Sequence, residues 1–145
     1  MGSTSYGPTF KGEVYPFAAA CAALEIYRTE PVAESVWRFG QRLQKGIISL
    51  VSEHRVAATS VGPPFRTALA FTEPSPERLR LKRTLYQQEL LRAGVNTYNG
   101  FMLPSYVHDE AALQATLAAV DRALRKIAAA ERSNDFERHI EIPLL

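Results

Sequence analysis

A polar, turn-forming segment near the start of the chain leads directly into a helix-forming block, and this junction could bind an anion. The segment reads GPTFKGE at positions 7–13, and the apolar block covers residues 14–27. Free N–H groups and the helix dipole both favour negative charge at a helix N-terminus. The alternative is that Thr9 is only a turn residue at the entry to the helix.

The other reactive side chains form no catalytic or metal-binding pattern. His54, His108 and His139 share no ligand spacing, so we expect no zinc site. The single cysteine, Cys21, excludes an internal disulfide, and its apolar helical surroundings predict a small buried core residue rather than a nucleophile. The sequence also contains neither a glycine-rich nucleotide fingerprint nor a GxSxG motif.

Composition and charge are typical of one soluble globular domain. The chain has 145 residues, of which 46% are hydrophobic and 22% charged, and its net charge is +2. Basic residues are mixed with acidic ones along the helical stretches, which argues against a nucleic-acid-binding surface. No signal peptide or membrane-spanning run is visible, so we expect a cytoplasmic protein whose partners are neither nucleic acid nor membrane.

Four helices are expected from the spacing of apolar residues and from capping residues. Pro31 fits the first turn of the second helix, and Ser75 is suited to cap the third. Gly94 is a stop signal for the third helix, and Asp109 opens the fourth. The expected helices cover residues 15–29, 31–54, 76–93 and 109–132.

Short strand candidates fill the gaps between these helices, at residues 56–61, 65–71, 94–98 and 101–105. In the second candidate, Phe65, Thr67, Leu69 and Phe71 alternate with Arg66, Ala68 and Ala70, which predicts two distinct faces. Asn99-Gly100 is a strong turn signal. We therefore expect an α+β domain with a small antiparallel or mixed sheet of three to four strands, packed with about four helices. The tail, residues 133–145, either docks on a partner or is flexible.

Several short motifs occur in an order that resembles a known enzyme family. They are TFKGE at 9–13, AAA at 18–20, EPV at 30–32, WRFGQRL at 37–43, LLRAGV at 90–95 and VHDE at 107–110. This series is similar to the C-terminal domain of class III (fold type I) aminotransferases that use pyridoxal 5'-phosphate (PLP), especially the branch that includes glutamate-1-semialdehyde aminomutase. The resemblance covers roughly residues 5–128, and it rests on the ordered series rather than on any one motif.

The resemblance implies the fold of the small C-terminal domain of these enzymes, amino-group transfer as the reaction, and PLP as the cofactor. It assigns to Thr9, with Phe10 beside it, contact with the phosphate of the PLP held by the neighbouring subunit. It divides the chain into a phosphate-contacting loop at 1–13, a small domain at 14–132 and the tail at 133–145.

Two local departures from the family pattern change what is expected. Pro8 stands where many members have glycine, which removes one N–H that could reach the phosphate. GFMLP at 100–104 lacks the arginine with which many members bind a substrate carboxylate; Phe101 stands in its place, which favours the aminomutase-like branch. Arg66 could still face the cleft as a substrate residue, and a surface charge on an edge strand is the alternative.

The largest departure concerns the Schiff-base lysine, which in the family lies upstream of this region, on the large domain. Lys11 follows Thr9, and Lys45, Lys82 and Lys126 are expected on solvated helix faces. We therefore expect the chain to be inactive alone and to work with a PLP-binding large domain or a companion chain, in a homodimer or heteromer. A non-catalytic dimerisation or interaction module derived from that domain, or a truncated product without function, are the alternatives.

Overall fold

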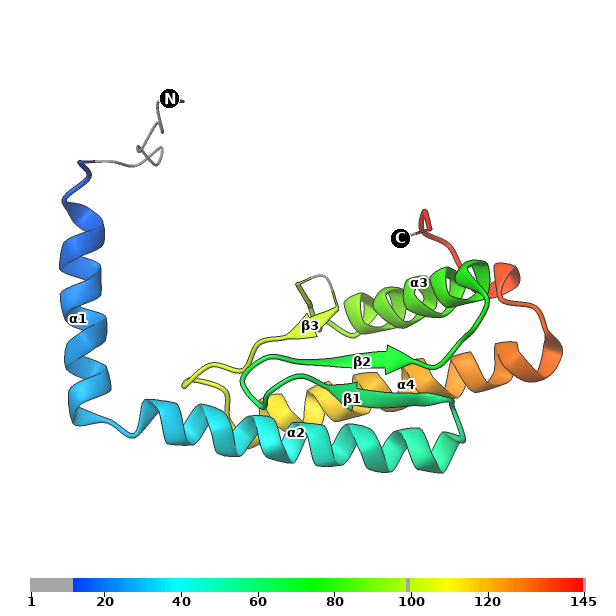
Figure 1. Ribbon diagram of the computed structural model, residues 1–145, viewed down its shortest axis with the longest axis horizontal. Coiled ribbons are helices and arrows are strands. Elements are labelled where there is room, and N and C mark those ends of the chain that lie inside the picture. Colours follow the sequence, from blue (N-terminus) through cyan, green and yellow to red (C-terminus); the bar gives the residue numbers. More distant parts are fainter. Residues whose placement is uncertain (1–11, 99, 145) are drawn as a thin grey trace, which may run out of the picture. The chain divides into compact units, whose positions relative to one another are not determined.

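The computed structural model describes residues 12–98 and 100–144, and these have the α+β architecture expected from the sequence (Figure 1). The elements are α1 Tyr15–Thr29, α2 Val32–His54, β1 Ala58–Val61, β2 Thr67–Phe71, α3 Pro76–Arg92, β3 Phe101–Met102, α4 Glu110–Ser133 and the 3-10 helix Glu137–His139. The chain divides into two compact units, one ending at Ala33 and one beginning at Glu34. Each unit is described by itself.

The first unit contains α1, none of whose residues is buried. Alanine-rich sequence forms helix readily, and Arg28 pairs with Glu25 one turn earlier at 2.6 Å. Cys21 is exposed, so the prediction that it is a buried core residue is wrong. Apolar neighbours along a helix predict that a cysteine is buried only if another element packs on the same face of the helix.

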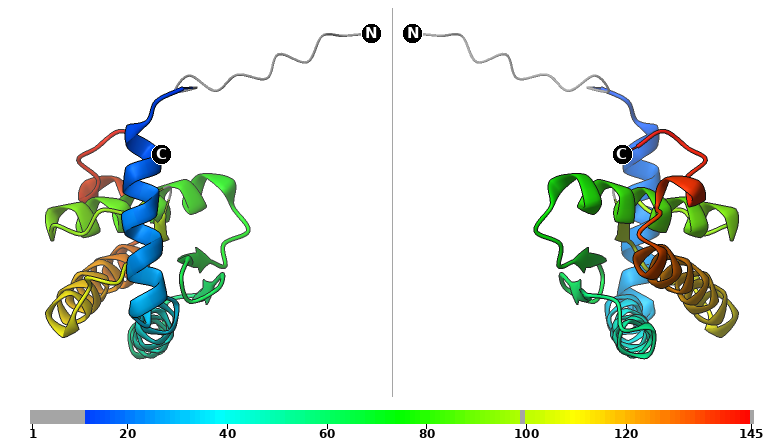
Figure 2. Two further views of the ribbon diagram at one scale, coloured as in Figure 1. Left: turned by 90° about the vertical axis from the view of Figure 1, so that its left-hand side faces the viewer. Right: turned by 90° about the vertical axis from the view of Figure 1, so that its right-hand side faces the viewer.

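In the second unit, α2 and α4 lie side by side on one face of the sheet (Figures 1 and 2). The spacing of three to four residues predicted for both helices brings their apolar stripes together. Leu43 and Ile47 of α2 and Val120, Leu124 and Ile127 of α4 are at most 2% exposed. Each such side chain contributes roughly 1.5–3 kcal/mol by its removal from water. These side chains belong to one hydrophobic core cluster.

Helix α3 packs along α4 and completes this core. The hydroxyl of Ser75 accepts a hydrogen bond from the N–H of Arg78 at 3.3 Å, which confirms the predicted cap. Leu85 and Leu90 are fully buried, and Gly94 with φ of 78° follows the helix end, as the sequence predicted.

The sheet is antiparallel, and β2 is its central strand. Ala58 of β1 pairs with Phe71, and Thr67 pairs with Met102 of β3. The predicted strand at 94–98 is wrong, because the N–H of Val95 bonds the carbonyl of Leu90 at the end of α3. The predicted strand at 101–105 is shortened to two residues, since Pro104 has no N–H to continue the ladder.

Two glycines seat the loop between β1 and β2 against α2. A Cβ on Gly40 would lie 2.0 Å from the carbonyl oxygen of Pro64, and Gly62 has a φ of 89°. The amide of Gln44 donates to the carbonyl of Gly62 at 2.8 Å and to the hydroxyl of Thr67 at 3.2 Å. The start of β2, with Arg66 just before it, is therefore held in place from α2.

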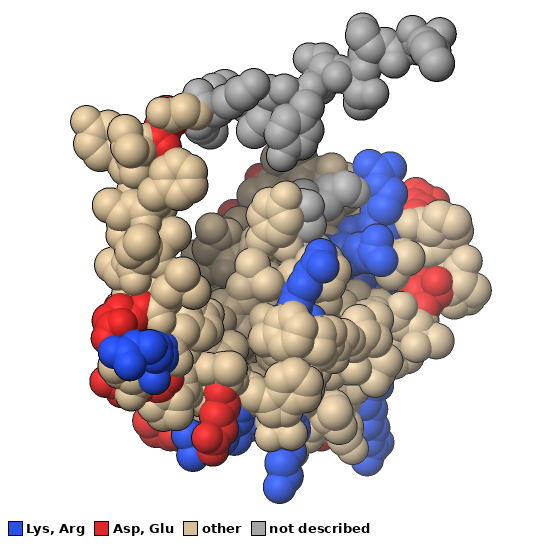
Figure 3. All heavy atoms as spheres, turned by 60° about the vertical axis from the view of Figure 1, so that its left-hand side comes forward, with Lys and Arg blue, Asp and Glu red and all other residues tan. Residues whose placement is uncertain are grey.

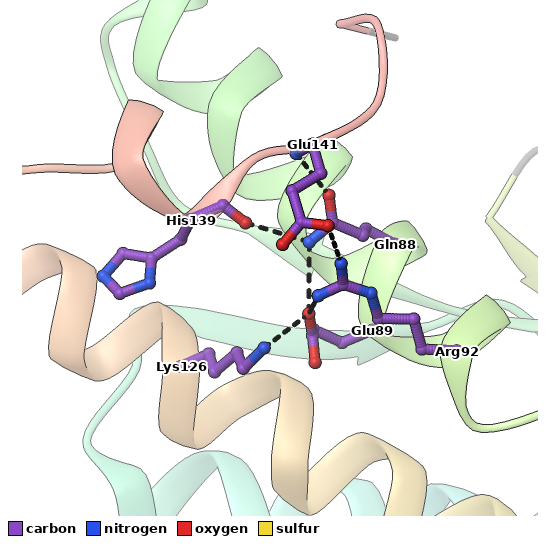
Figure 4. A network of polar contacts seen from close by, with 6 residues as sticks. All are labelled: Gln88, Glu89, Arg92, Lys126, His139 and Glu141. Carbon is purple, nitrogen blue, oxygen red and sulfur yellow. Dashed lines mark hydrogen bonds and ion pairs between the residues drawn. The ribbon is translucent and has the colours of Figure 1, made fainter.

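The tail returns to α3 and docks within the chain (Figure 4). Phe136 is 4% exposed and belongs to the core. The side-chain amide of Gln88 donates to the carbonyl of His139 at 2.9 Å and accepts from the N–H of Glu141 at 2.7 Å. Residues 136–141 thus contact α3 and the core of the same chain, and docking of the tail on a partner stays a prediction.

We expect Gly40→Ala to destabilise the second unit by about 2 kcal/mol or more, because the added methyl group meets backbone rather than a movable side chain. Urea unfolding followed by circular dichroism measures this. Ser49→Ala, at an exposed position of the same helix, is the control. A simple gain in helix propensity would instead make Gly40→Ala more stable, by about 1 kcal/mol.

Candidate functional site on the outer face of the sheet

The face of the sheet turned away from α2 and α4 is where side chains remain accessible. We call it the outer face; strand register and alternation place on it Thr59, Val61, Arg66, Ala68, Ala70 and Phe101. Thr67 and Phe71, which point the other way, are buried, as the predicted alternation along β2 requires. The sequence thus indicated correctly which residues of β2 are accessible.

A cavity of about 610 Å³ lies between the outer face and α3. This volume falls within the usual range of small-molecule sites. The strands contribute apolar residues, and α3 contributes polar and basic ones. The lining residues are Val61, Ala68, Leu69, Ala70, Phe71, Arg80, Arg83, Tyr86, Gln87, Thr97, Gly100 and Phe101.

Arg66 does not line this cavity, but its guanidinium lies 4.2 Å from the centroid of the Phe101 ring, which does. The contact is a cation–π interaction, worth about 0.5–1 kcal/mol at an exposed site. Arg66 is exposed and directly precedes β2, which is the central strand, so it is a surface charge but not one on an edge strand. The structure brings together Arg66 and Phe101, which the sequence singled out separately. The role of Arg66 in substrate binding stays a prediction.

Tyr86 is a polar residue of the cavity lining that the sequence analysis did not single out. It is 4% exposed, and its ring meets that of Phe71 edge-on, with centroids 5.8 Å apart. Burial raises the pKa of the Tyr86 hydroxyl well above its usual value, so the group is neutral. Within the described part of the chain the hydroxyl has no hydrogen-bond partner. The only sequence signal was a tyrosine among leucines, where a buried hydroxyl needs a partner.

Lys82 is buried, so the prediction that it lies on a solvated helix face is wrong. Its side chain is 3% exposed, and its ammonium lies 2.7 Å from both Glu73 and Glu131. Burial lowers the pKa of Lys82, but the hydrogen bonds that its ammonium donates to Glu131 and Glu73 outweigh burial, and the net pKa is raised. A charged amine held by two carboxylates has no lone pair with which to form a Schiff base.

The other lysines are also not placed for Schiff-base chemistry. Lys126 lies 2.8 Å from the carboxylate of Glu89, and Lys45 is exposed on α2. Within residues 12–98 and 100–144, no lysine lines the outer-face cavity or the smaller cavity of about 290 Å³ beside β3. Thr9, Phe10 and Lys11 lie outside the described residues, so the roles inferred for Thr9 and Phe10 stay predictions.

The three histidines occupy separate environments. His54 lies 2.6 Å from Asp121, whose pKa is lowered chiefly by that hydrogen bond. His108 accepts a hydrogen bond from the N–H of Ser105 at 3.1 Å. Among the described residues, no three histidine, cysteine or acidic side chains gather as metal ligands. A search of the same residues finds no helix with the length and apolar character needed to cross a bilayer.

Solved structures of PLP proteins have the same fold. The chain is similar to the FumI protein of Sphingopyxis sp. MTA144, solved in its PLP internal aldimine form, with a TM-score of 0.74 and 25% sequence identity over 89% of this chain. It is also similar in fold to an omega-transaminase from Sphaerobacter thermophilus, with a TM-score of 0.72 and 18% identity over 87% of this chain. The fold is that of the small C-terminal domain of fold type I PLP enzymes, as the sequence predicted.

The chain spans only 31% of the length of each of these two solved proteins. No protein-family model matches the sequence, and no curated protein matches it. The likeness is thus carried by structure, and it is to aminotransferases in general; nothing in it distinguishes the aminomutase branch.

We expect stability to be constant in the neutral range and to fall at both extremes of pH. The pKa of Glu89 is lowered in the folded chain, because hydrogen bonds from Lys126 and its neighbours outweigh burial, and hydrogen bonds lower the pKa of Glu73. Their contribution is present above the ordinary glutamate value of about 4.3 and is lost as pH falls through the lowered pKa. The raised pKa of Lys82 has the opposite sign: its contribution is present below about 10.4 and is lost as pH rises further.

Urea midpoints measured from about pH 3 to about pH 11 test this expectation. In Lys82→Met the two carboxylates lose the ammonium between them, and only Glu73 keeps a cation, Arg78 at 3.5 Å, so the midpoint should fall and its alkaline decline should become shallower. Lys45→Met, at an exposed position, should behave as the native chain does. Equal effects of the two substitutions would show that the buried ion pairs do not control this dependence.

Proposed function

We propose that this chain is the C-terminal part of a PLP-dependent enzyme of the class III aminotransferase type, in which it closes the active-site cleft. Amino-group transfer needs a lysine that binds PLP as a Schiff base, and that lysine belongs to a large domain or companion chain. Alone, the chain is inactive. PLP supplies the amino-group chemistry when it is bound to the lysine-bearing part.

One observation carries this proposal: the match in fold to a PLP protein over 89% of the chain, at a TM-score of 0.74. The placement of the lysines supports the second half of the proposal. The ammonium groups of Lys82 and Lys126 are tied to carboxylates, and Lys45 points from an exposed helix face. A Schiff-base lysine needs a desolvated amine in a pocket, and none of these three meets that need.

Within the assembled enzyme, Arg66 is the substrate-binding residue that we propose for this domain. Its guanidinium lies over Phe101, at the sequence position where many members carry an arginine. Arg66, next to β2, thus supplies a positive charge beside Phe101, where many members carry an arginine. The absence of arginine at position 101 is therefore a weaker argument for the aminomutase-like branch. We retain the aminomutase-like reaction as a proposal within the broader aminotransferase class, with Thr9 and Phe10 contacting the phosphate of the PLP of the neighbouring subunit.

A non-catalytic dimerisation module is the second candidate, and the surface of α1 favours it. Tyr15, Phe17, Leu24 and Tyr27 are all more than 60% exposed, and the helix has no buried residue. Exposed apolar groups of this kind favour association. This candidate requires a discrete oligomer that forms without PLP or a lysine-bearing partner.

Borohydride trapping tests whether the chain is inactive alone. The purified chain is mixed with equimolar PLP, reduced and mapped by mass spectrometry, so that any lysine that forms a Schiff base keeps a pyridoxyl group. We expect no lysine to be labelled stoichiometrically, because those described are charged and paired or fully solvated. Stoichiometric labelling of one lysine would mean that the chain holds PLP itself.

Isolation of the tagged chain from its source cells tests the enzyme role. After borohydride reduction, the proposal requires a co-purifying polypeptide that carries pyridoxyl-lysine, and a complex that transfers amino groups. In that complex, Arg66→Gln should lower kcat/KM at least about tenfold, as expected for loss of a hydrogen bond to a charged group. Arg122→Gln, on the exposed side of α4, is the matched control. A homo-oligomer without any pyridoxyl-lysine chain would favour the module instead.

A further inference from the structure

Helix α1 carries large apolar side chains on all of its sides, and none of its residues is buried. Successive residues of an α-helix are rotated by about 100°, so Tyr15 and Ile26 lie on one side, Phe17 and Leu24 on the opposite side, and Tyr27 between them. These five side chains are between 49% and 85% exposed. A helix that rests on its own domain has one apolar stripe and one polar face, whereas a helix that is apolar all round is normally enclosed by other elements.

The charges of α1 are few, and they are paired within the helix. Residues 14–24 contain no charged side chain. Glu25 accepts two hydrogen bonds from Arg28, at 2.6 and 3.0 Å, so this pair needs no charged partner from another element. In the space-filling view of Figure 3, the column on the left is α1; it is uncharged along its middle, and charged side chains lie toward its ends. The surface of α1 therefore fits an apolar surrounding rather than a charged one.

The size of the helix distinguishes between two possible occupants of its surface. A helix of 15 residues is about 22 Å long and about 10 Å wide, so its lateral surface is roughly 700 Å². Pairing with α1 of a second copy would cover about a third of that surface, whereas a stable interface buries about 800 Å² on each partner. Enclosure on all sides brings the buried surface close to that value. These areas favour a partner that surrounds α1 over a second copy of the helix.

We infer that α1 is the segment that this chain inserts into the lysine-bearing part of the enzyme, where apolar side chains enclose it on all sides. α1 then belongs to the body that holds PLP, and the unit that begins at Glu34 is the part that closes the cleft. The division of the chain into one unit that ends at Ala33 and one that begins at Glu34 agrees with this boundary. The inference rests on the proposed function, and it moves the start of the small domain from residue 14 to residue 34.

Alkylation of Cys21 tests this inference, because it is the only cysteine of the chain and is exposed on α1. The tagged full chain is isolated from its source cells together with the polypeptide that borohydride reduction of a separate portion marks with pyridoxyl-lysine. Labelling by N-ethylmaleimide is followed by mass spectrometry. We expect Cys21 to react at least about tenfold more slowly in this complex than in the free chain, because an enclosed thiol reacts only when the structure opens locally.

A second thiol position tests whether α1 is enclosed on all sides. In a Cys21→Ser background, Ala23→Cys places the thiol on the opposite side of the helix, since two residues turn it by about 200°. Ala23 is exposed in the free chain. We expect this thiol to be protected in the complex as strongly as Cys21 is. Protection of only one of the two positions would mean that α1 docks by a single face, which would overturn the inference.

The outcomes of labelling separate this inference from the proposed function. Rapid labelling of Cys21 in a complex that contains the pyridoxyl-lysine polypeptide would overturn the inference and leave the proposed function standing. So would protection that rises with the concentration of the purified chain alone, because α1 would then pair with a second copy. If no pyridoxyl-lysine polypeptide is recovered, the proposed function fails, and the inference fails with it.

Charged substitutions on opposite sides of α1 give an independent readout. Leu24→Glu and Ile26→Glu should each reduce recovery of the pyridoxyl-lysine polypeptide at least about tenfold, because each places an unpaired charge in an apolar surrounding. Both positions are exposed in the free chain. Ile48→Glu makes the same change at a 52% exposed position of α2 and should recover the partner as the native chain does. Equal loss in all three variants would overturn the inference, because the docking surface would then not be specific to α1.

Discussion

In the unit that begins at Glu34, α2 and α4 cover the same face of the three-stranded sheet, and the accessible chemistry follows from this asymmetry. The buried stripes of α2 and α4 fix which face is covered. Because side chains alternate along a strand, the same register that buries Thr67 turns Ala68 outward. A shift of one residue would bury Arg66 and expose the core residues of β2. The position of Arg66 over Phe101 therefore depends on the packing of the opposite face.

Buried charge links the elements that bound the outer-face cavity. Lys82 joins α3 to α4 through Glu131 and to the loop after β2 through Glu73. Glu89 joins the same two helices through Lys126. Such groups give little net stability, since desolvation offsets their attraction, but each is costly to leave unpaired. They therefore favour one arrangement of α3 on α4 over other packings of similar apolar area, and so they fix the helix face that carries Arg83 and Tyr86.

The sequence predicted what depends on local spacing, and it failed where a third element decides. The four helices, the Ser75 cap and the two faces of β2 follow from periodicity and capping, which neighbouring residues determine. The burial of Lys82 could not be predicted, because both of its partners lie on other elements. The error at Cys21 is the opposite one. Burial was predicted from the apolar residues around it, but no other element of the described chain packs on that face of α1. Arg66 and Phe101 were each noticed, but only the strand register shows that they meet.

The contact between Gln88 and the tail uses only the backbone of the tail. The side-chain amide of Gln88 donates to the carbonyl of His139 and accepts from the N–H of Glu141. A neighbouring β-strand would bond the backbone of the tail in the same way. These two hydrogen bonds do not depend on the side chains of residues 139–141, and any residue with a backbone N–H can make the second of them at position 141. Over evolutionary time this contact constrains position 88 to glutamine or an amide of similar reach, and it leaves the side chain at position 139 free to change. Phe136, which is buried in the core, and Glu141, which pairs with Arg92, are held by contacts of their own side chains.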